Sequence, residues 1–477
     1  MTRSSRRWAA LAVIALAQFM VIMDTSIIGV ALPQIQGDVG FSPDSLSWVF
    51  NAYVIAFGGL LLLGGRLTDL FGARRLFITG WAVLAAASLV AGLAGSPGVE
   101  IAARAGQGVG AALIAPAALT LLMMLFGSDP KELTKAFAIY GAAAPAGGTA
   151  GVFLGGVLTE WASWPWIFYI NIPIALGVVV ASASLMPTAP ARRGSVDLLG
   201  AASATAGLAL TVFGIVRAPQ AGWGSQVTLF SIAGGVALLV AFVAIQASRR
   251  QPLMRLAILR TPNLAAANLA QLLLGAAWIP MWFFLNLYLQ QVLGYGAFAS
   301  GAALLPMTVT IMVLMVAVAP RLIARLGPKA PAVAGMILLS AGMLLLSFIR
   351  SDGNFVVDVL PASLIAAAGM SLAFIPTLGT AISAARPEEG GLASGIVNTA
   401  YQVGSALGLA VMTAIATTNG ADQLGKLPSL TDGYSAAFLG AAAVAAIGAL
   451  VATALLRTAR PAQAPADETQ DQQALAA

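Results

Sequence analysis

The chain has 477 residues, of which 59% are hydrophobic and 9% are charged; an ordinary soluble domain is about 25% charged. Together with a mean hydropathy of +0.90, this composition indicates a membrane protein with many spans. The sequence contains no cysteine and no histidine, which excludes disulfides, thiol chemistry and metal sites built from those side chains, and no metal site is expected. The net charge of +6 does not indicate nucleic-acid binding, because the basic residues are spread over short loops.

Apolar runs separated by polar, glycine-bearing or proline-bearing breaks predict fourteen membrane-spanning helices, so the expected fold class is an all-α polytopic membrane protein. In chain order the predicted spans are 8–33, 46–65, 76–95, 98–125, 136–158, 164–186, 196–216, 226–247, 264–292, 299–320, 331–349, 357–384, 391–417 and 434–456. The residues after Arg457 are rich in Ala, Gln, Pro and acids, and we expect a disordered cytoplasmic tail there.

The positions of the basic residues support this number of spans, because cytoplasmic loops carry an excess of Lys and Arg. With the N-terminus inside, all but four of the 24 basic residues fall in inner segments, the exceptions being Arg104, Arg217, Arg350 and Lys426. A twelve-span alternative, in which 196–247 would lie on the surface, fits the charges less well. We therefore expect a multi-pass protein of the cell membrane with both termini in the cytoplasm.

A short internal repeat suggests how the spans are organised. Residues Gly65–Arg75, GRLTDLFGARR, align without a gap with Pro320–Ala330, PRLIARLGPKA, and both segments are predicted to be inner loops eight spans apart. Parallel halves around a site at the membrane midplane are a known transporter architecture. The expected division is an N-terminal six-helix bundle at 8–187, two linker helices at 188–260, a C-terminal six-helix bundle at 261–457 and a tail at 458–477.

Two charged residues inside predicted spans are the strongest candidates for function. Asp24 is the one acid well inside a span, and Arg104 is the one basic residue in that position. At 1.5 Å per residue both lie roughly 9–14 Å below the predicted outer surface, so they could interact. A membrane carboxylate is costly unless it is paired or lines a polar cavity. Burial disfavours the ionised form of a carboxyl group, and a nearby guanidinium favours it. Asp24 could therefore exchange a proton when access to it changes from one side of the membrane to the other.

Both residues also have structural interpretations. Arg104 could extend towards the surface or pair with Glu100 one turn away, and Asp24 could be a packing residue hydrogen-bonded to Thr25 or another neighbour. The sequence has no G-x-x-x-x-G-K-[ST] motif, so ATP hydrolysis is not supported. We expect no cofactor and a proton gradient as the source of energy.

The motifs together resemble the major facilitator superfamily, and within it the fourteen-span drug:proton antiporter branch. Asp24–Pro33, DTSIIGVALP, resembles the span-1 signature of that branch, with Gly29 where the family usually has Asn. Arg104, followed by Gln107 and Gly108, matches a span-4 motif implicated in proton coupling. Residues 166–173 and 391–395 are similar to further landmarks. The resemblance implies two six-helix bundles plus two extra helices, with Asp24 and Arg104 in proton coupling.

Gly65–Arg75 resembles the superfamily loop motif between spans 2 and 3, and the resemblance implies a cytoplasmic gate that locks the outward-facing state. The gate candidates are Gly65, Arg66, Asp69, Gly72, Arg74 and Arg75. The acid and the arginines lie where two helices emerge and could bridge neighbouring helix ends. Alternatively, the arginines serve only topology and contact with anionic lipid.

In span 5 the resemblance is incomplete, because Val152 stands where the antiporter motif normally has Pro. The glycine run nevertheless has the small-x-x-x-small spacing of a helix that packs closely and slides. Its members are Gly147, Gly148, Gly151, Gly155 and Gly156.

Polar and aromatic residues inside the spans are candidates for substrate binding, namely Asn51, Tyr53, Gln107, Trp278, Trp282, Asn286, Gln290, Asn398 and Gln402. Trp278, Trp282 and Asn286 are spaced to share one helix face. Aromatic faces can hold organic cations or flat apolar molecules, although tryptophans also mark the membrane interface. The sequence offers one intramembrane acid, whereas a divalent organic cation would normally need two membrane carboxylates. We therefore expect neutral or monocationic substrates and about one proton per transport cycle.

The sequence-based hypothesis is a monomeric, non-enzymatic transporter that exports drug-like or antibiotic-like amphiphiles by proton-coupled alternating access. Its partners would be the small-molecule substrate, protons and the lipid bilayer, and not nucleic acid. The alternatives are a proton-coupled symporter of a small metabolite and a non-transporting membrane sensor.

Overall fold

The computed structural model describes residues 3–188, 197–249, 252, 256–384 and 390–457; a few side chains within its helices, those of Asp69 and Pro145 among them, lie outside this description. In the described part the chain is helical and contains no strand. Fourteen helices are long and apolar enough to cross a membrane, which confirms the predicted number of spans. The expected tail at 458–477 lies outside the described residues.

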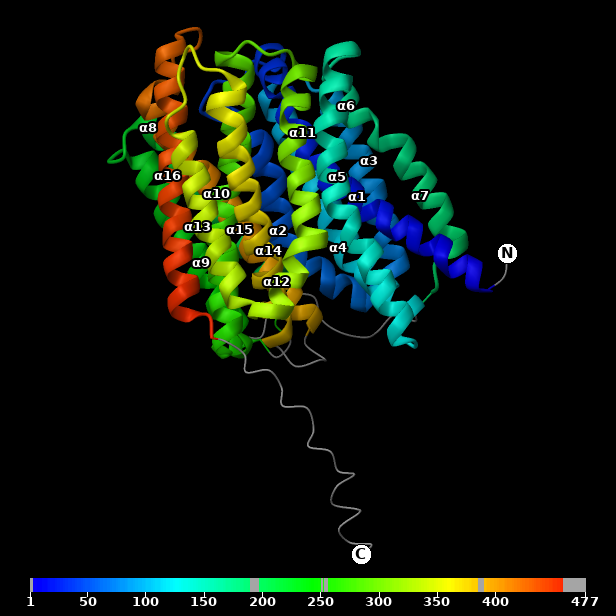
Figure 1. Cartoon of the computed structure of the whole chain (residues 1–477). Coiled ribbons are helices and arrows are strands. Elements are labelled where there is room, and N and C mark those ends of the chain that lie inside the picture. The colour runs from blue at the N-terminus through cyan, green and yellow to red at the C-terminus, as the bar shows by residue number, and fades with distance from the viewer. Residues whose placement is uncertain (1–2, 189–196, 250–251, 253–255, 385–389, 458–477) are drawn as a thin grey trace, which may run out of the picture.

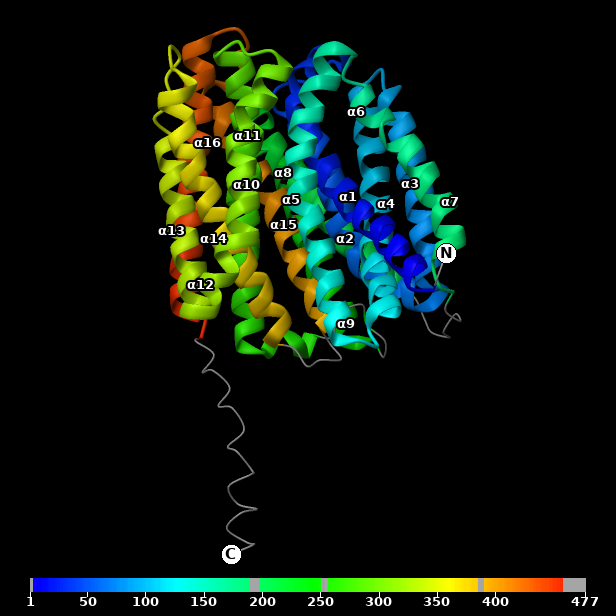
Figure 2. The same ribbon diagram turned by 45° about the vertical axis from the view of Figure 1, so that its right-hand side comes forward.

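The first six spans are built from seven helices, because α6 and α7 together form one span. The helices are α1 (Arg3–Val39), α2 (Trp48–Phe71), α3 (Ala73–Gly92), α4 (Pro97–Phe126), α5 (Pro130–Trp161), α6 (Trp166–Tyr169) and α7 (Asn171–Leu185). The main packing partners are α1 with α5, α2 with α4, and α3 with both α4 and α7. In Figures 1 and 2, α1 crosses the bundle obliquely, and its N-terminal end lies beside the C-terminal end of α7.

The next two spans, α8 (Leu198–Ala221) and α9 (Gln226–Ser248), pack against each other. Asp197 joins them, since its carboxylate accepts hydrogen bonds from the Gly200 amide nitrogen at 2.9 Å and from the Gln246 Nε2 atom at 2.8 Å. α8 also contacts α2 and α15. α9 exposes apolar side chains such as Phe230 and Val240, as expected of a helix that faces lipid.

The last six spans contain several π-helical turns. Their segments are α10 (Pro262–Leu287) with η3 (Tyr288–Val292), α11 (Ala297–Val313) with η4 (Leu314–Val318) and α12 (Ala319–Leu326), α13 (Lys329–Leu346), η5 (Phe355–Val359) with α14 (Leu360–Ala384), α15 (Gly390–Ala416) with η7 (Thr417–Ala421), and α16 (Leu427–Leu455). α10 packs on α15 and α16, and α13 packs on α14 and α16.

In both copies of the internal repeat, the helix is interrupted at an equivalent glycine. Gly72 separates α2 from α3 with a φ of 91°, and Gly327 follows α12 with a φ of 74°. These glycines occupy the same place in the aligned segments, and only glycine adopts such angles readily. The prediction that both eleven-residue segments are loops is wrong. Their residues before the glycine continue the preceding helix, because a single positive-φ residue is enough to end one helix and start the next.

The predicted end of the first span, Pro33, is also wrong, since α1 continues through this proline to Val39. The side chains of Ile35 and Val39 are buried beyond it. An interior proline removes one backbone hydrogen bond, and the packing of this apolar face against neighbouring helices keeps the helix intact.

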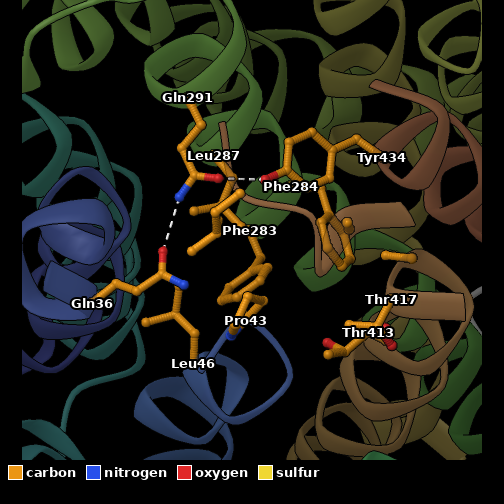
Figure 3. Close-up of a pocket in the computed structure, with 13 residues that line it drawn as sticks. Gln36, Pro43, Leu46, Phe283, Phe284, Leu287, Gln291, Thr413, Thr417 and Tyr434 are labelled. Carbon is orange, nitrogen blue, oxygen red and sulfur yellow. Dashed lines mark hydrogen bonds between the residues drawn. The ribbon is translucent and has the colours of Figure 1, made fainter. Parts of the chain in front are cut away.

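We call the end of the bundle where α1 and α5 finish and α11 begins the distal end, which is the upper end in Figure 1. There a chain of polar side chains joins the two halves. Gln291 donates from Nε2 to the Gln36 Oε1 atom at 2.9 Å, and the Tyr434 hydroxyl donates to the Gln291 Oε1 atom at 2.6 Å (Figure 3). The cavity beside this chain, lined by Phe283 and Leu46 among others, leaves about 10 Å³, which is about the space of one water molecule. The distal end is therefore closed.

A second contact between the halves closes the other side of the distal end. The backbone of Gly156 in α5 packs against Ala297 and Phe298 in α11. The Glu160 carboxylate accepts a hydrogen bond from the Phe298 amide at 3.1 Å, and the Trp161 ring stacks on the Phe298 ring at 5.2 Å. These contacts tie the end of α5 to the start of α11.

Four of the five span-5 glycines pack closely against neighbouring helices, whereas Gly148 makes only ordinary contacts at 3.8 Å. A Cβ atom on Gly151 would lie 2.8 Å from the Met23 carbonyl oxygen, and one on Gly155 would lie 2.7 Å from the Ile27 carbonyl oxygen. Gly147 meets the Phe19 carbonyl oxygen in the same way. Residues four apart on α5 thus bring its backbone against α1. Gly156 faces α11 instead, and the sliding motion itself stays a prediction.

The glycine contact predicts a specific loss of stability. Gly151→Ala should lower the free energy of unfolding by about 1–3 kcal/mol, because the added methyl group overlaps the α1 backbone. Thermal unfolding of the purified protein in detergent measures this. Gly141→Ala is the matched control on the same helix, since nothing lies within 4 Å of its added Cβ atom. An equal effect of both substitutions would contradict the packing argument.

Candidate functional site

An ion pair between α1 and α4 lies in the interior of the N-terminal helices. The Arg104 Nη1 atom donates to the Asp24 Oδ2 atom at 2.8 Å. The side chains are 0% and 1% exposed, respectively. The two charges that the sequence placed at similar depth are therefore in direct contact. A buried pair of this kind is stable only when further hydrogen bonds satisfy both groups.

Two amide side chains complete the surroundings of the Asp24 carboxylate. Its Oδ1 atom accepts from the Gln107 Nε2 atom at 3.1 Å and from the Asn171 Nδ2 atom at 2.9 Å. Both amides also donate to the Ser88 hydroxyl oxygen, at 2.8 and 3.2 Å. We call Asp24, Ser88, Arg104, Gln107 and Asn171 the coupling centre. The Asp24 carboxylate thus accepts three hydrogen bonds, and the coupling centre brings α1, α3, α4 and α7 together at this point.

The guanidinium is held equally firmly. The Arg104 Nε atom donates to the Val49 carbonyl oxygen at 2.9 Å, and its Nη1 atom also donates to the Gln107 Oε1 atom at 2.6 Å. Its Cζ atom lies 4.7 Å from the centre of the Tyr53 ring and 5.9 Å from that of Phe168, where the ring faces attract a cation. The glycine that follows Gln107 allows α4 to approach the α2 backbone this closely.

The structural alternatives for Arg104 are wrong, whereas that for Asp24 stays open, because neighbouring side chains donate hydrogen bonds to its carboxylate. Arg104 neither extends to the surface nor forms an ion pair with Glu100. The Thr25 hydroxyl donates to the Ile22 carbonyl oxygen of its own helix at 2.7 Å, so it is not the partner of Asp24. The role of Asp24 and Arg104 in proton coupling stays a prediction, but their geometry allows it.

The sequence analysis missed a second buried acid. Glu100 in the first turn of α4 is 0% exposed, and neither of its carboxylate oxygens has a hydrogen-bond partner. Glu100 belongs to the first turn of its span, so the prediction that only Asp24 lies well inside a span is not contradicted, but the charge count based on one intramembrane acid omitted a buried carboxyl group. A residue in the first turn of a predicted span was expected to reach the surface, but the neighbouring helices cover it. A charged residue in the first turn of an apolar run is the signal that could have identified it.

The sequence analysis also did not assign Ser88 and Asn171 to the site. Asn171 lies inside a segment that was noted as a family landmark, and Ser88 is one small polar residue in an apolar run. Their signal was weak, because serine and asparagine occur in many spans without contacting a charge. In the structure the Asn171 amide donates to the Asp24 carboxylate and to the Ser88 hydroxyl oxygen, and Ser88 also accepts a hydrogen bond from the Gln107 amide.

The tryptophan face of α10 packs against α1 rather than against lipid. The Trp278 and Trp282 side chains are 8% and 7% exposed, with ring centres 6.3 Å apart, so the interpretation as a lipid-facing belt is wrong. The Asn286 Nδ2 atom donates to the Trp282 carbonyl oxygen at 2.9 Å. A Cβ atom on Gly29 would lie 2.9 Å from that same Nδ2 atom. The departure from Asn at position 29 therefore makes room for α10.

The nine candidate substrate-binding residues come from several helices. Asn51, Tyr53 and Gln107 lie on α2 and α4 with the coupling centre, four lie along α10 and η3, and Asn398 and Gln402 lie on α15. Gln290 donates to the Val30 carbonyl oxygen at 2.9 Å, and Gln402 packs on Gly58. None of the nine lines the small distal cavity between the halves.

Some candidates nevertheless carry buried polar atoms without a partner. These are both amide atoms of Asn51, the Tyr53 hydroxyl and the Asn286 Oδ1 atom. Unpaired polar atoms are costly in the interior of a protein, so these positions are suited to bind a ligand or water at another stage of a cycle.

The gate candidates lie at the end of the bundle opposite the distal end. The Arg74 guanidinium donates to the Ala183 carbonyl oxygen at the end of α7, and Arg75 is exposed. The side chain of Asp69 lies outside the described residues. The locking role of this segment therefore stays a prediction.

The comparisons with known proteins agree with this architecture. The model of the Major Facilitator Superfamily matches residues 14–409. Cephamycin export protein CmcT from Amycolatopsis lactamdurans is 38% identical, with 97% of this chain and 94% of that protein covered. Puromycin resistance protein pur8 from Streptomyces alboniger is 36% identical, with 97% and 93% covered. The crystal structure of an auto-inhibited POT family peptide transporter shares the fold, with a TM-score of 0.69, 16% identity, and 97% of this chain and 99% of that chain covered.

The buried ion pair predicts a characteristic pattern of stability. Arg104→Gln leaves the Asp24 charge without its cation and should lower the free energy of unfolding by about 3–5 kcal/mol. The double variant D24N/R104Q should recover most of this loss, because no ion then remains buried and unpaired. Thermal unfolding in detergent measures all three proteins.

The exposed ion pair of Arg350 with Asp358 supplies the control. Arg350→Gln should cost at most about 1 kcal/mol, since solvent screens this pair. A double variant that is no more stable than R104Q would contradict the interpretation of Asp24 and Arg104 as an energetically coupled pair.

Proposed function

This chain belongs to the Major Facilitator Superfamily, and on that premise we propose that it exports amphiphilic, antibiotic-like small molecules in exchange for protons. The relatives named for cephamycin export and puromycin resistance, each similar over 97% of this chain, support the substrate class. The observation that carries the proton coupling is the fully buried contact of Asp24 with Arg104.

The coupling centre offers a direct way to link a proton to a conformational change. When the Asp24 carboxylate takes up a proton, its charge is neutralised, and its attraction for the Arg104 guanidinium and for the amide donors weakens. Because these groups belong to α1, α4 and α7, protonation loosens the contacts of α1 with the other two helices. Arg104 keeps its own proton throughout, since an arginine is not deprotonated in proteins.

The orientation follows from the basic residues. Among the described residues, four basic ones stand at helix ends on the side of the bundle opposite the distal end, namely Arg66, Arg74, Arg321 and Lys329. The cytoplasmic side of membrane proteins is rich in Lys and Arg. We therefore assign the distal end to the outside of the cell membrane and the termini to the cytoplasm. On this assignment the structure is closed to the outside.

Charge balance supports neutral or monocationic substrates. Asp24 and Glu100 together with Arg104 give the buried centre at most one net negative charge, so a dication would stay uncompensated. The buried aromatic face of Trp278 and Trp282 supplies the flat apolar surface that an amphiphile needs. The unpaired Asn286 Oδ1 atom beside it can accept a hydrogen bond.

Transport by purified protein in liposomes with an imposed pH gradient tests the function, with puromycin and ethidium as probes. We expect probe movement in one direction to drive protons in the other. Asp24→Asn should reduce this proton movement to the level of empty liposomes, because the proton-binding group is gone. Asp38→Asn, on the same helix, should keep it. Proton movement in the same direction as the probe would indicate a symporter, and no probe movement in the wild type would contradict an exporter of this class.

Alternating access predicts that the distal contact must open in each cycle. The sequence contains no cysteine, so the variant W161C/F298C has two thiols at side chains that touch across the halves. A short bis-methanethiosulfonate reagent should join them and stop transport of the same probes, and a reductant should restore it. Each single-cysteine variant, treated in the same way, should stay active. Full transport in the cross-linked protein would contradict opening at this end.

A further inference from the structure

Glu100 is a buried acid that the proposed transport step does not use. It lies one helical turn from Arg104 on the distal side, it is 0% exposed, and both of its oxygens lack a hydrogen-bond donor. The guanidinium one turn away binds Asp24 through Nη1, and its Nη2 atom has no partner. Glu100 therefore stands next to the coupling centre without being bonded to it.

The number of buried charges around Arg104 decides whether the Glu100 carboxyl group is protonated or ionised. Arg104 lies one turn from Glu100 on α4, and its ion-pair partner is Asp24, so these two are the charged groups described beside the Glu100 carboxyl group. One guanidinium can compensate one carboxylate, so two ionised carboxylates would leave a buried charge unpaired. Such a charge is neutralised by protonation rather than tolerated. Asp24 accepts three hydrogen bonds and Glu100 accepts none, so the two acids are not equivalent.

We propose that Glu100 carries a proton in this conformation while Asp24 is ionised, and that Glu100 is a second proton site on the outer side of the coupling centre. Its role in transport rests on the proposed function. When the proton leaves the Glu100 carboxyl group for the Asp24 carboxylate, Glu100 becomes the ionised acid and is positioned one turn from the guanidinium. The centre then still holds one cation, one carboxylate and one proton, so the transfer changes the partner of Arg104 without changing the buried charge.

Infrared spectroscopy of the purified protein tests where the proton resides, because a protonated carboxyl group has a carbonyl stretch separate from that of a carboxylate. We expect wild-type protein at neutral pH to show this band. Protein synthesised with carbon-13-labelled glutamate should show it at lower frequency, whereas labelled aspartate should leave it in place. The band should be absent from Glu100→Gln, and it should remain in the control Glu160→Gln, which removes an exposed glutamate.

A band that moves with labelled aspartate and not with labelled glutamate would place the proton on Asp24 and overturn the proposal. A wild-type protein without the band, or a Glu160→Gln protein that loses it, would overturn it as well. If Glu100→Gln fails to fold, the isotope shift in the wild type still decides between the two acids. The spectra are recorded without substrate, so their result does not depend on whether puromycin or ethidium is transported.

Discussion

The contact of Asp24 with Arg104 is the interaction on which the rest of the structure depends. Two charges can lie inside an apolar bundle only if they pair and if hydrogen bonds satisfy their remaining atoms. Gln107 and Asn171 supply such bonds to the Asp24 carboxylate, and they require α4 and α7 to meet α1 at one level, whereas the Arg104 Nη2 atom has no partner. A buried ion pair adds little net stability compared with apolar packing, which is consistent with the role in proton coupling that we propose for it.

Close backbone approach makes this arrangement possible. Gly151 and Gly155 bring α5 against α1, and Gly29 gives room to Asn286 on α10. At these contacts helices touch through backbone atoms, which a small displacement can rearrange without moving large side chains. The distal closure combines hydrogen bonds such as that of Gln291 with Gln36, the stacking of Trp161 on Phe298 and the packing of Gly156 on α11. Such a contact can form and break as a unit.

Glu100 changes how the coupling centre is understood. A single acid paired with a single cation would have to give up its partner whenever it binds a proton, which would leave the guanidinium unpaired in an apolar interior. A second acid one turn from Arg104 offers another partner and keeps the number of buried charges constant. The two acids and the one cation thus form a set in which a proton can move without exposing an unpaired charge.

The sequence by itself determined the number of spans, because apolar runs of membrane length are unambiguous when charges flank them. It also determined that Asp24 and Arg104 are exceptional and that Trp278, Trp282 and Asn286 share a helix face, since these follow from composition and spacing. Only the tertiary structure decided that Glu100 is buried, that Asn171 and Ser88 belong to the centre, and that α1 passes through Pro33. The physical reason is that burial and hydrogen bonding depend on what other helices place against a residue, which local periodicity does not contain.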